Sequence, residues 1–337
     1  MKSQASSRLA DELISRLCCP SCHGSLAEMT DGGYRCPGCG REFPKLRGVV
    51  RFVPAQNYAD SFGFQWQRYD RTQLDEGDVR NSEKNFKWRT GFTPDELRGK
   101  LVLDVGCGMG RFAEVATRYG ARVVGIDLSA AAEVAARNLA DREFVAFQAD
   151  VFELPFALAS FDYIYSLGVL HHTPDCEKAF KNLPQYLKPG GEIAIWLYSG
   201  YNKWYRFSDI YRRVTSRMSA RTLHGILRVA VPFFYGLGKF LSKIPLVGKP
   251  LAGMVRHLFP VNQNPNPEVR ILDTFDWYSP KYQSKHTYEQ VFRWFESCGL
   301  TNLRVLEQSV SVRGQKPAVN ASEFGVNETV SLGSSAR

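Results

Sequence analysis

The chain has 337 residues, of which 44% are hydrophobic and 23% are charged, and its formal net charge is +9. This ordinary globular composition excludes a wholly disordered chain, and the length predicts two or three folding units. No stretch of about 20 apolar residues occurs, which excludes a membrane-spanning helix. The N-terminal residues are polar and lack the apolar core of a secretory signal, so we expect a cytoplasmic protein.

Two Cys-x-x-Cys pairs dominate the first segment, residues 1–54, which is expected to begin with a short helix. Cys19 and Cys22 form one pair, and Cys36 and Cys39 form the other. Four thiolates at this spacing can close a tetrahedral Zn²⁺ site, and such a site leaves no position open for catalysis. Metal binding would also supply folding energy that so small a segment cannot gain from a core. We therefore predict a structural zinc ribbon rather than disulfides, in a reducing compartment.

The sequence around the four cysteines, LCCPSCHGSL…YRCPGCGREFP…GVVRF, also supports a comparison with a known module. It resembles the small zinc-ribbon partner subunit of tRNA and protein-release-factor methyltransferases, here fused to the N-terminus of the chain. The resemblance implies a recognition module through which a protein partner could dock.

The next segments change from aromatic and polar to alternating apolar and amphipathic. Residues 55–98 are expected to form a helical linker that covers part of the following core, residues 99–200. The alternation in that core is typical of a parallel sheet with helices between its strands. We predict a Rossmann-like, doubly wound α/β sheet of seven strands, in which the last two form an antiparallel pair. The expected strands are 101–105, 122–126, 144–148, 163–166, 192–197, 303–307 and 309–313, with a helix at 288–298.

The first apolar strand of this core runs directly into a loop that contains Gly106, Gly108 and Gly110. Glycines let the backbone pass close to a ligand, and the free N–H groups of the following helix can bind it. Asp127 ends the next strand, where its carboxylate can accept both hydroxyls of a ribose. The loop also matches the GxGxxA form of a dinucleotide site from Gly108 to Ala113, so taken alone it leaves NAD open.

Further motifs in the same order decide between these cofactors. Asp104-x-Gly106-x-Gly108-x-Gly110 is similar to motif I of the class I S-adenosylmethionine (SAM) methyltransferases. The similarity continues without a gap to Glu192, and its nearest type is the ubiquinone/menaquinone-biosynthesis methyltransferase. The later motifs are Gly125-Ile-Asp127-Leu-Ser129, Gln148-Ala-Asp150-Val151, Leu154-Pro155-Phe156, Phe161-Asp162-Tyr-Ile-Tyr165, His171-His172-Thr-Pro-Asp175 and Leu187-Lys-Pro-Gly190-Gly191-Glu192.

The resemblance implies a SAM-binding role for individual residues. Asp104 and the glycines of the loop would hold the methionine part, and Asp127 would bind the ribose. Leu128 and Val151 would contact the adenine, Asp150 would accept a hydrogen bond from its amino group, and Leu167 would face the sulfonium region. For Asp127 and Asp150, a strand-end turn and a helix cap are the plain structural alternatives.

Catalysis of methyl transfer depends largely on positioning, and a base is needed only when the acceptor carries a proton. His171 and His172 follow the fourth strand, Tyr198 ends the fifth, and His286 lies further on. Each is a candidate catalytic residue on the acceptor side, although His172 could instead pack or cap a turn. No Asn-Pro-Pro-Tyr or Asp-Pro-Pro-Tyr sequence follows the fourth strand, which argues against amino methylation of adenine or glutamine.

The basic charge of the chain is concentrated in a predicted helical insert, residues 201–267. Between 201 and 260, eleven lysines and arginines accompany a single acid, Asp209, and large apolar residues lie between them. This composition fits an anionic membrane surface, a lid over an apolar or phosphate-bearing acceptor, or a nucleic-acid backbone. A solvated helical lid is the plain alternative. The many large apolar residues make nucleic acid the least favoured partner.

The C-terminal part of the core is expected at 268–316, with a disordered tail at 317–337. Its aromatic run at 273–282 could form a wall of the acceptor-binding site or plain core.

We predict a SAM-dependent methyltransferase that acts on oxygen or carbon of a small-molecule, lipid-linked or glycan-type acceptor. It would be cytoplasmic, with peripheral contact at the inner membrane face as an option. The alternatives are an RNA or protein methyltransferase that recognises its substrate through the ribbon, and a non-catalytic SAM-binding scaffold.

Overall fold

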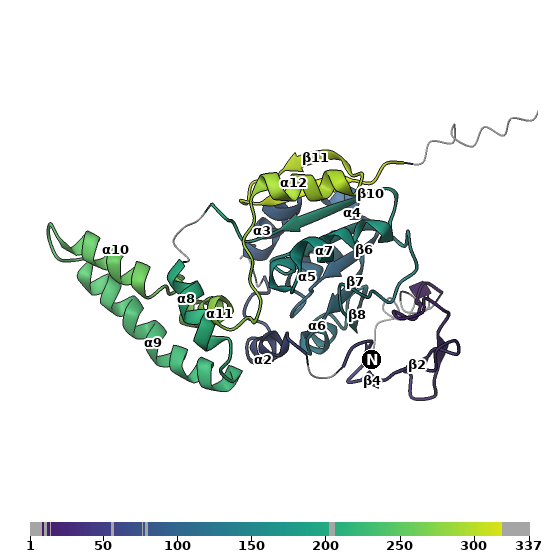
Figure 1. Cartoon of the computed structure of the whole chain (residues 1–337), viewed down its shortest axis with the longest axis horizontal. Coiled ribbons are helices and arrows are strands. Elements are labelled where there is room, and N and C mark those ends of the chain that lie inside the picture. The colour runs from purple at the N-terminus through teal and green to yellow at the C-terminus, as the bar shows by residue number, and fades with distance from the viewer. Residues whose placement is uncertain are drawn as a thin grey trace, which may run out of the picture.

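The computed structural model describes residues 9, 12–13, 15–54, 57–75, 77, 80–201 and 206–318. A mostly parallel sheet runs through the centre, with helices on both of its faces (Figure 1). The predicted N-terminal helix lies largely outside the described residues, and so does most of the predicted disordered tail.

The central sheet has nine strands, so the prediction of a Rossmann-like parallel sheet is confirmed, whereas the predicted number of seven strands is wrong. β12 runs antiparallel to both of its neighbours, as the predicted closing pair requires. The order is β11 (Thr301–Val305), β12 (Ser311–Gln315), β10 (Leu187–Trp196), β9 (Phe161–Leu167), β6 (Leu101–Val105), β7 (Arg122–Asp127), β8 (Phe144–Gln148), β5 (Val49–Arg51) and β4 (Lys45–Leu46).

The two additional strands, β4 and β5, come from the end of the cysteine-rich segment. β5 pairs in parallel with β8 through Val50 and Phe147, and β4 folds back on β5 as an antiparallel partner. These strands have only two and three residues, too few for an alternating hydrophobic pattern to be recognised. They extend the central sheet beyond the predicted core and attach the ribbon to it.

Two hydrophobic cores lie on opposite faces of the sheet. On one face, α3 (Asn81–Thr90), α4 (Pro94–Leu97), α5 (Arg111–Arg118) and α6 (Ala131–Asn138) pack their small and aromatic side chains. On the other face, α7 (Cys176–Lys181) and α12 (Tyr288–Ser297) share a core with the ribbon. β6 has all five residues buried because it is covered on both faces, which explains its uninterrupted apolar sequence.

Four helices form a lobe to one side of the sheet (Figure 1): α8 (Arg206–Thr215), α9 (Ala220–Leu241), α10 (Gly248–Leu258) and α11 (Pro267–Tyr278). α11 was expected to belong to the core, but its Phe275 and Tyr278 pack against Leu223, Leu227 and Val231 of α9. α2 (Asp60–Arg68) connects the lobe to α6, since it contacts both. Among the described residues, no helix combines the length and hydrophobicity needed to cross a membrane.

Candidate active site and metal site

A cavity of about 1420 Å³ lies at the carboxyl ends of the parallel strands. β7 and β8 lie on one side of β6, and β9 and β10 lie on the other, so the chain reverses its direction of travel across the sheet here. Ligands of open α/β sheets bind in the crevice that such a reversal creates. α2 and α11 cover this crevice, so the cavity is bounded by the sheet, by the linker and by the lobe.

The glycine loop between β6 and α5 forms the floor of the cavity. Gly106 and Gly108 line it and have φ angles of +80° and +53°, which side-chain-bearing residues rarely adopt. A Cβ atom on Gly106 would lie 2.4 Å from the Val169 side chain, so the close approach also requires glycine. Gly110 caps the start of α5 and does not line the cavity.

Asp127, at the end of β7, lines the cavity and holds the glycine loop in place. One carboxylate oxygen accepts the backbone N–H of Gly108 at 3.0 Å, and the other accepts the backbone N–H and hydroxyl of Ser129. Burial raises the pKa of Asp127, and these donors oppose the increase. The carboxylate predicted to bind ribose is thus a member of a network that includes the loop.

Asp104 occupies the fourth position of β6, beneath the loop, and does not line the cavity. Its carboxylate accepts a hydrogen bond from the Tyr165 hydroxyl at 3.0 Å. Burial raises the pKa of Asp104 to about 8, and the neighbouring charge of Asp127 adds to the increase. Asp104 was predicted to hold the methionine part of SAM. Because Asp104 lies outside the cavity wall, it would act on that part of SAM only through the glycine loop.

The other residues predicted to bind SAM line the cavity together: Leu128, Asp150, Val151 and Leu167. Asp150 follows β8, and its Oδ1 atom accepts the backbone N–H of Phe152 at 3.1 Å, while no hydrogen bond to Oδ2 is formed by the described residues. Burial raises the pKa of Asp150. Two carboxylates and an apolar side chain from each of two strand ends therefore face one space, as binding of a nucleoside would require.

His172 is the predicted catalytic histidine that reaches the cavity; His171 does not line it. The two residues lie in the short 3-10 helix η1 (Leu170–His172) after β9, and both are buried. Nδ1 of His172 lies 3.1 Å from the carbonyl oxygen of Tyr282, while Nε2 has no hydrogen-bond partner among the described residues. Burial lowers the pKa of His172, although the charge of Asp276 opposes this, so the neutral ring is favoured at pH 7.

The remaining acceptor-side candidates differ in their surroundings. His171 stacks on the ring of Tyr198, with 3.9 Å between ring centroids, so its contacts are those of a packed aromatic side chain. Tyr198 lines the cavity, and its hydroxyl donates to Asp276 at 2.6 Å. His286 lies outside the cavity, with Nε2 2.7 Å from the Ser284 hydroxyl.

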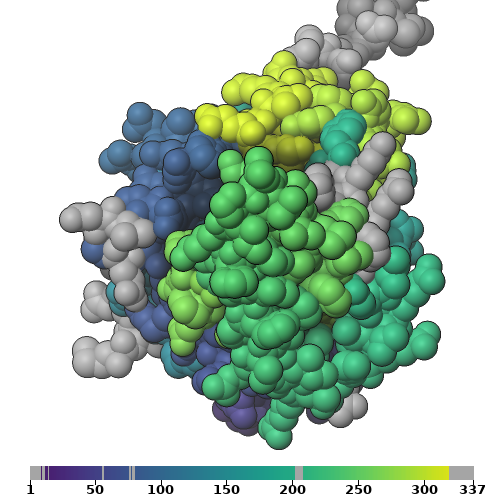
Figure 2. Space-filling view, turned by 90° about the vertical axis from the view of Figure 1, so that its left-hand side faces the viewer, coloured from purple at the N-terminus to yellow at the C-terminus, as the bar shows by residue number. Residues whose placement is uncertain are grey.

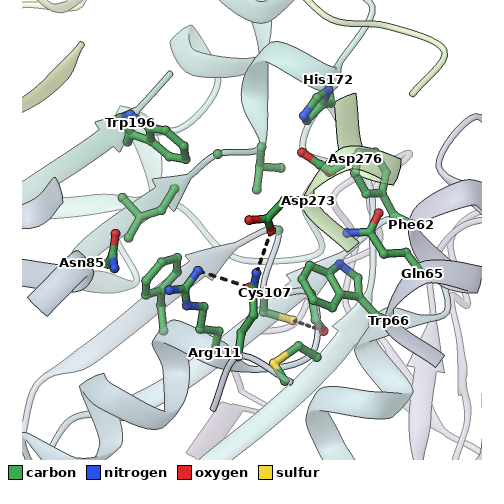
Figure 3. A pocket seen from close by; sticks show the side chains of 18 of the residues that line it. Phe62, Gln65, Trp66, Asn85, Cys107, Arg111, His172, Trp196, Asp273 and Asp276 are labelled. Carbon is green, nitrogen blue, oxygen red and sulfur yellow. Dashed lines mark hydrogen bonds between the residues drawn. The ribbon is translucent and has the colours of Figure 1, made fainter. Parts of the chain in front are cut away.

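Several cavity residues were not predicted from the sequence. Figure 3 shows His172, Asp276 and Phe62 on one side of the cavity and Trp196, Asn85 and Arg111 on the other. Phe62 and Trp66 come from α2, whose aromatic residues were predicted only to cover the core. The acids Asp273 and Asp276 come from α11, inside the aromatic run for which an acceptor wall was one alternative. Nothing in the sequence around the cavity arginines, Arg89 and Arg111, indicates that they would meet.

The four predicted metal ligands form one cluster. All four sulfur atoms lie within 4.8 Å of one another, with 3.6 Å between Cys19 and Cys39 and 3.4 Å between Cys22 and Cys36. A tetrahedral Zn²⁺ with bonds of about 2.3 Å needs sulfur atoms roughly 3.8 Å apart. These cysteines are therefore positioned to bind a metal. β1 (Ala27–Glu28), β2 (Tyr34–Arg35) and β3 (Glu42–Phe43) form a small sheet between and beside the pairs.

The ribbon is continuous with the wall of the cavity. Phe43 of the ribbon packs against Phe52, and Phe52 packs against Phe147 of β8. Phe52 also donates its N–H to the carbonyl of Gln148, whose side-chain amide donates to the carbonyl of Leu128. A short chain of contacts therefore joins the segment that carries the four-cysteine cluster to Leu128, a residue of the predicted adenine site.

Comparisons with known proteins match the central segment of the chain. Residues 103–195 match the model of a family described as a methyltransferase domain. The ubiquinone biosynthesis O-methyltransferase of Coxiella burnetii is 37% identical over 100 residues, or 29% of this chain and 43% of that protein. The chloroplastic tocopherol O-methyltransferase of Arabidopsis thaliana is 34% identical over 128 residues, or 36% of each protein. A solved S-adenosylmethionine-dependent methyltransferase from Mesorhizobium loti aligns at 31% identity with a TM-score of 0.31, over 34% of this chain and 54% of that chain.

The matched segment runs from β6 to β10 and includes the glycine loop, Asp127 and Asp150. The chain therefore contains a SAM-dependent methyltransferase domain with a Rossmann-like fold. Within that class, the two curated relatives named above are O-methyltransferases, and the chain spans less than half of their length. The ribbon and the helical lobe lie outside the segment matched by the family model.

Proposed function

We propose that this chain transfers the methyl group of SAM to an oxygen or carbon atom of a small-molecule, lipid-linked or glycan-type acceptor. SAM supplies a methyl group on a sulfonium ion, which is already activated for in-line displacement. The carboxylates of Asp127 and Asp150 would bind the ribose and the adenine amino group, between the apolar side chains of Leu128 and Val151. Asp104 would act on the methionine end through the glycine loop.

His172 is the best candidate for a general base, and this favours a hydroxyl acceptor. Its Nδ1 faces a carbonyl oxygen and therefore carries the proton, which leaves the lone pair on Nε2 for the acceptor. A hydroxyl bound beside Nε2 would lose its proton to the ring as its oxygen takes the methyl group. Tyr198, held by Asp276, would orient the same acceptor. The unpartnered Nε2 is the observation that carries this assignment.

The lobe supports a second part of the proposal, peripheral contact with an anionic membrane. Leu246, between α9 and α10, is fully exposed, and Val229 and Phe240 of α9 are 74% and 66% exposed. α9 and α10 form one outer face of the molecule (Figure 2). No acidic residue lies between Asp209 and Glu268, whereas lysines flank the exposed turn. Exposed apolar side chains among cations are typical of surfaces that lie in a lipid headgroup layer.

The methyltransferase proposal is tested with SAM that carries a labelled methyl group and an extract of the source cells. The wild-type protein and Asp127→Ala are compared, and lipid, small-molecule, RNA and protein fractions are separated. We expect label in the small-molecule or lipid fraction with the wild type only. Label in RNA or protein would favour a macromolecular substrate, and SAM binding without labelling of any fraction would favour a scaffold.

The membrane proposal is tested by co-sedimentation with vesicles of phosphatidylcholine, with and without phosphatidylglycerol. We expect binding only to the anionic vesicles and a clear loss with Leu246→Asp. Leu158→Asp is the matched control, because Leu158 is 63% exposed but lies outside the lobe. Equal behaviour of the two variants, or no binding to anionic vesicles, would contradict membrane contact through the lobe.

A further inference from the structure

Arg89 of α3 lines the cavity and forms no ion pair within the part of the chain that the structure describes. Its guanidinium lies over the ring of Trp196, 3.8 Å from the centroid, and its Nε atom is buried with no hydrogen-bond partner among the described residues. No carboxylate of the described chain forms an ion pair with it. Burial, together with the charge of Arg111, lowers the pKa of Arg89 to about 9.

Arg111, at the start of α5, places a second guanidinium in the same wall. Both groups lie against the ring of Phe112, at 4.9 Å for Arg111 and 5.6 Å for Arg89. Arg111 donates to two neutral partners, the Ser82 hydroxyl and the Gln73 side-chain carbonyl. Two cations therefore share a partly buried wall, although like charges in a medium of low dielectric constant repel each other.

The acids across the cavity are occupied by other groups. Asp273 accepts hydrogen bonds from the side-chain amides of Gln73 and Asn262, and Asp276 accepts one from the Tyr198 hydroxyl. Burial, together with the charge of Asp276, raises the pKa of Asp273 to about 6. Arg89 and Arg111 moderate this increase without forming an ion pair with Asp273. Asp75, which also lines the cavity, pairs with Arg118. Asp273 and Asp75 thus lie within electrostatic range of Arg111, but neither arginine forms an ion pair with an acid among the described residues.

We propose that Arg89 and Arg111 form an anion subsite that binds a carboxylate or phosphate group of the methyl acceptor. This inference rests on the proposed function, because it takes the cavity to be the acceptor site. Arginine presents a planar fork of donors that matches both anions, and stacking on Trp196 leaves the donor edge of Arg89 free. The Trp196 ring is itself fixed, since its N–H donates to the carbonyl of Ser309 at 3.2 Å. An acceptor would then be held at one end by its charge while its reacting atom faces His172.

The test is calorimetric titration of the full-length, zinc-loaded protein saturated with S-adenosylhomocysteine. The probes are phenyl phosphate, benzoate and the neutral benzyl alcohol, and each is titrated into the wild type, Arg89→Gln and Arg89→Lys. Arg98→Gln is the matched control, because Arg98 is exposed and does not line the cavity. Inorganic phosphate and dihexanoyl phosphatidic acid, as further probes, distinguish a free phosphate from a lipid phosphate.

We expect at least one anionic probe to bind the wild type and Arg98→Gln about tenfold or more tightly than benzyl alcohol, since hydrogen bonds to charged groups are the strong ones. Arg89→Gln should remove this preference, and Arg89→Lys should restore part of it. Anions that bind no better than the alcohol, or equally well to Arg89→Gln, would overturn the subsite. Failure of S-adenosylhomocysteine to bind while the anion binds would instead overturn the proposed function alone.

Discussion

At the scale of single residues, the side chains around the cavity combine structural and chemical roles. Asp127 accepts the backbone N–H of Gly108, so the carboxylate predicted to bind ribose also fixes the loop beside it. His172 is held through Nδ1 by Tyr282, from a segment more than a hundred positions away in the sequence. The first contact joins two consecutive motifs, whereas the second depends on how the segment after α11 packs against the core.

Methyl transfer that uses His172 as a base should depend on pH. A base must be neutral to accept a proton, so activity through His172 is lost as pH falls through its pKa. Burial and the charge of Arg212 lower that pKa, while Asp276 and the Tyr282 carbonyl oppose the decrease, and the net shift is below the usual value of 6.5. The acidic limb of kcat/KM, measured with saturating SAM, should therefore have its midpoint below pH 6.5.

His172→Gln provides the control for this limb. The amide can keep the hydrogen bond to Tyr282 but cannot take the proton, so kcat should fall about 100-fold or more and the limb should disappear. A limb centred above pH 6.5, or one that persists in His172→Gln, would assign proton transfer to another group.

At the scale of elements, the closing pair of strands is anchored by a buried cation. Arg313 of β12 is 1% exposed, pairs with Glu192 of β10 and with Glu96 of α4, and donates to the carbonyl of Gly91 at 3.0 Å. Removal of one member of a buried ion pair leaves the others unpaired and costs about 3–5 kcal/mol. We therefore expect Arg313→Ala to lower the free energy of unfolding by about that amount in urea denaturation.

Arg304→Ala is the matched control for this prediction. Arg304 lies directly opposite Arg313 on β11, but its side chain faces solvent, so its loss should change stability by about 0.5 kcal/mol or less. Equal effects of the two substitutions would mean that the buried network does not anchor the hairpin.

The ribbon yields a prediction that couples metal to cofactor. Structural zinc contributes on the order of 10 kcal/mol of apparent binding free energy in small modules, and this is folding energy. Cys36→Ser should therefore lose zinc, lower the Tm and weaken SAM binding, because the ribbon contacts β8 and, through Gln148, Leu128. Zinc content by atomic absorption, thermal unfolding and SAM titration measure the three effects.

Cys18→Ser is the control for Cys36→Ser, since Cys18 precedes the predicted ligand Cys19 in the sequence but lies outside the cluster of four sulfur atoms. It should retain zinc and SAM binding. If Cys36→Ser lost zinc and still bound SAM as the wild type does, the ribbon would be a separate module without influence on the cavity.

The strands that could be predicted from the sequence are those with a long hydrophobic pattern. The five core strands and the closing pair have enough consecutive apolar residues to be recognised, and all seven are present. β5 is recognised only from its pairing with β8, and β4 only from its pairing with β5. α11 is assigned to the lobe only by its contacts with α9. Whether a short strand forms, and against which part of the protein an amphipathic helix packs, depend on tertiary contacts that no local sequence pattern contains.

At the scale of the whole molecule, the two segments outside the matched domain lie at different sides of the sheet (Figure 1). The ribbon adds to the edge beyond β8, and the lobe provides α11 as a wall of the cavity. Most of the residues predicted to bind SAM line the cavity together, and they could be singled out because they lie in consecutive motifs. Arg89, Arg111 and Asp273 could not be predicted to line one cavity, because they come from three different helices and no shared motif contains them.

Calorimetric titration of SAM determines whether this cavity binds SAM through the carboxylate at the end of β7. The wild type should bind one equivalent, and Asp127→Asn should bind at least about tenfold more weakly, since it loses a charge that accepts hydrogen bonds. Asp95→Asn is the control, because the Asp95 side chain is 95% exposed and does not line the cavity. Unchanged affinity in Asp127→Asn would show that this carboxylate does not bind SAM, and no binding by the zinc-loaded wild type would show that the cavity is not a SAM site.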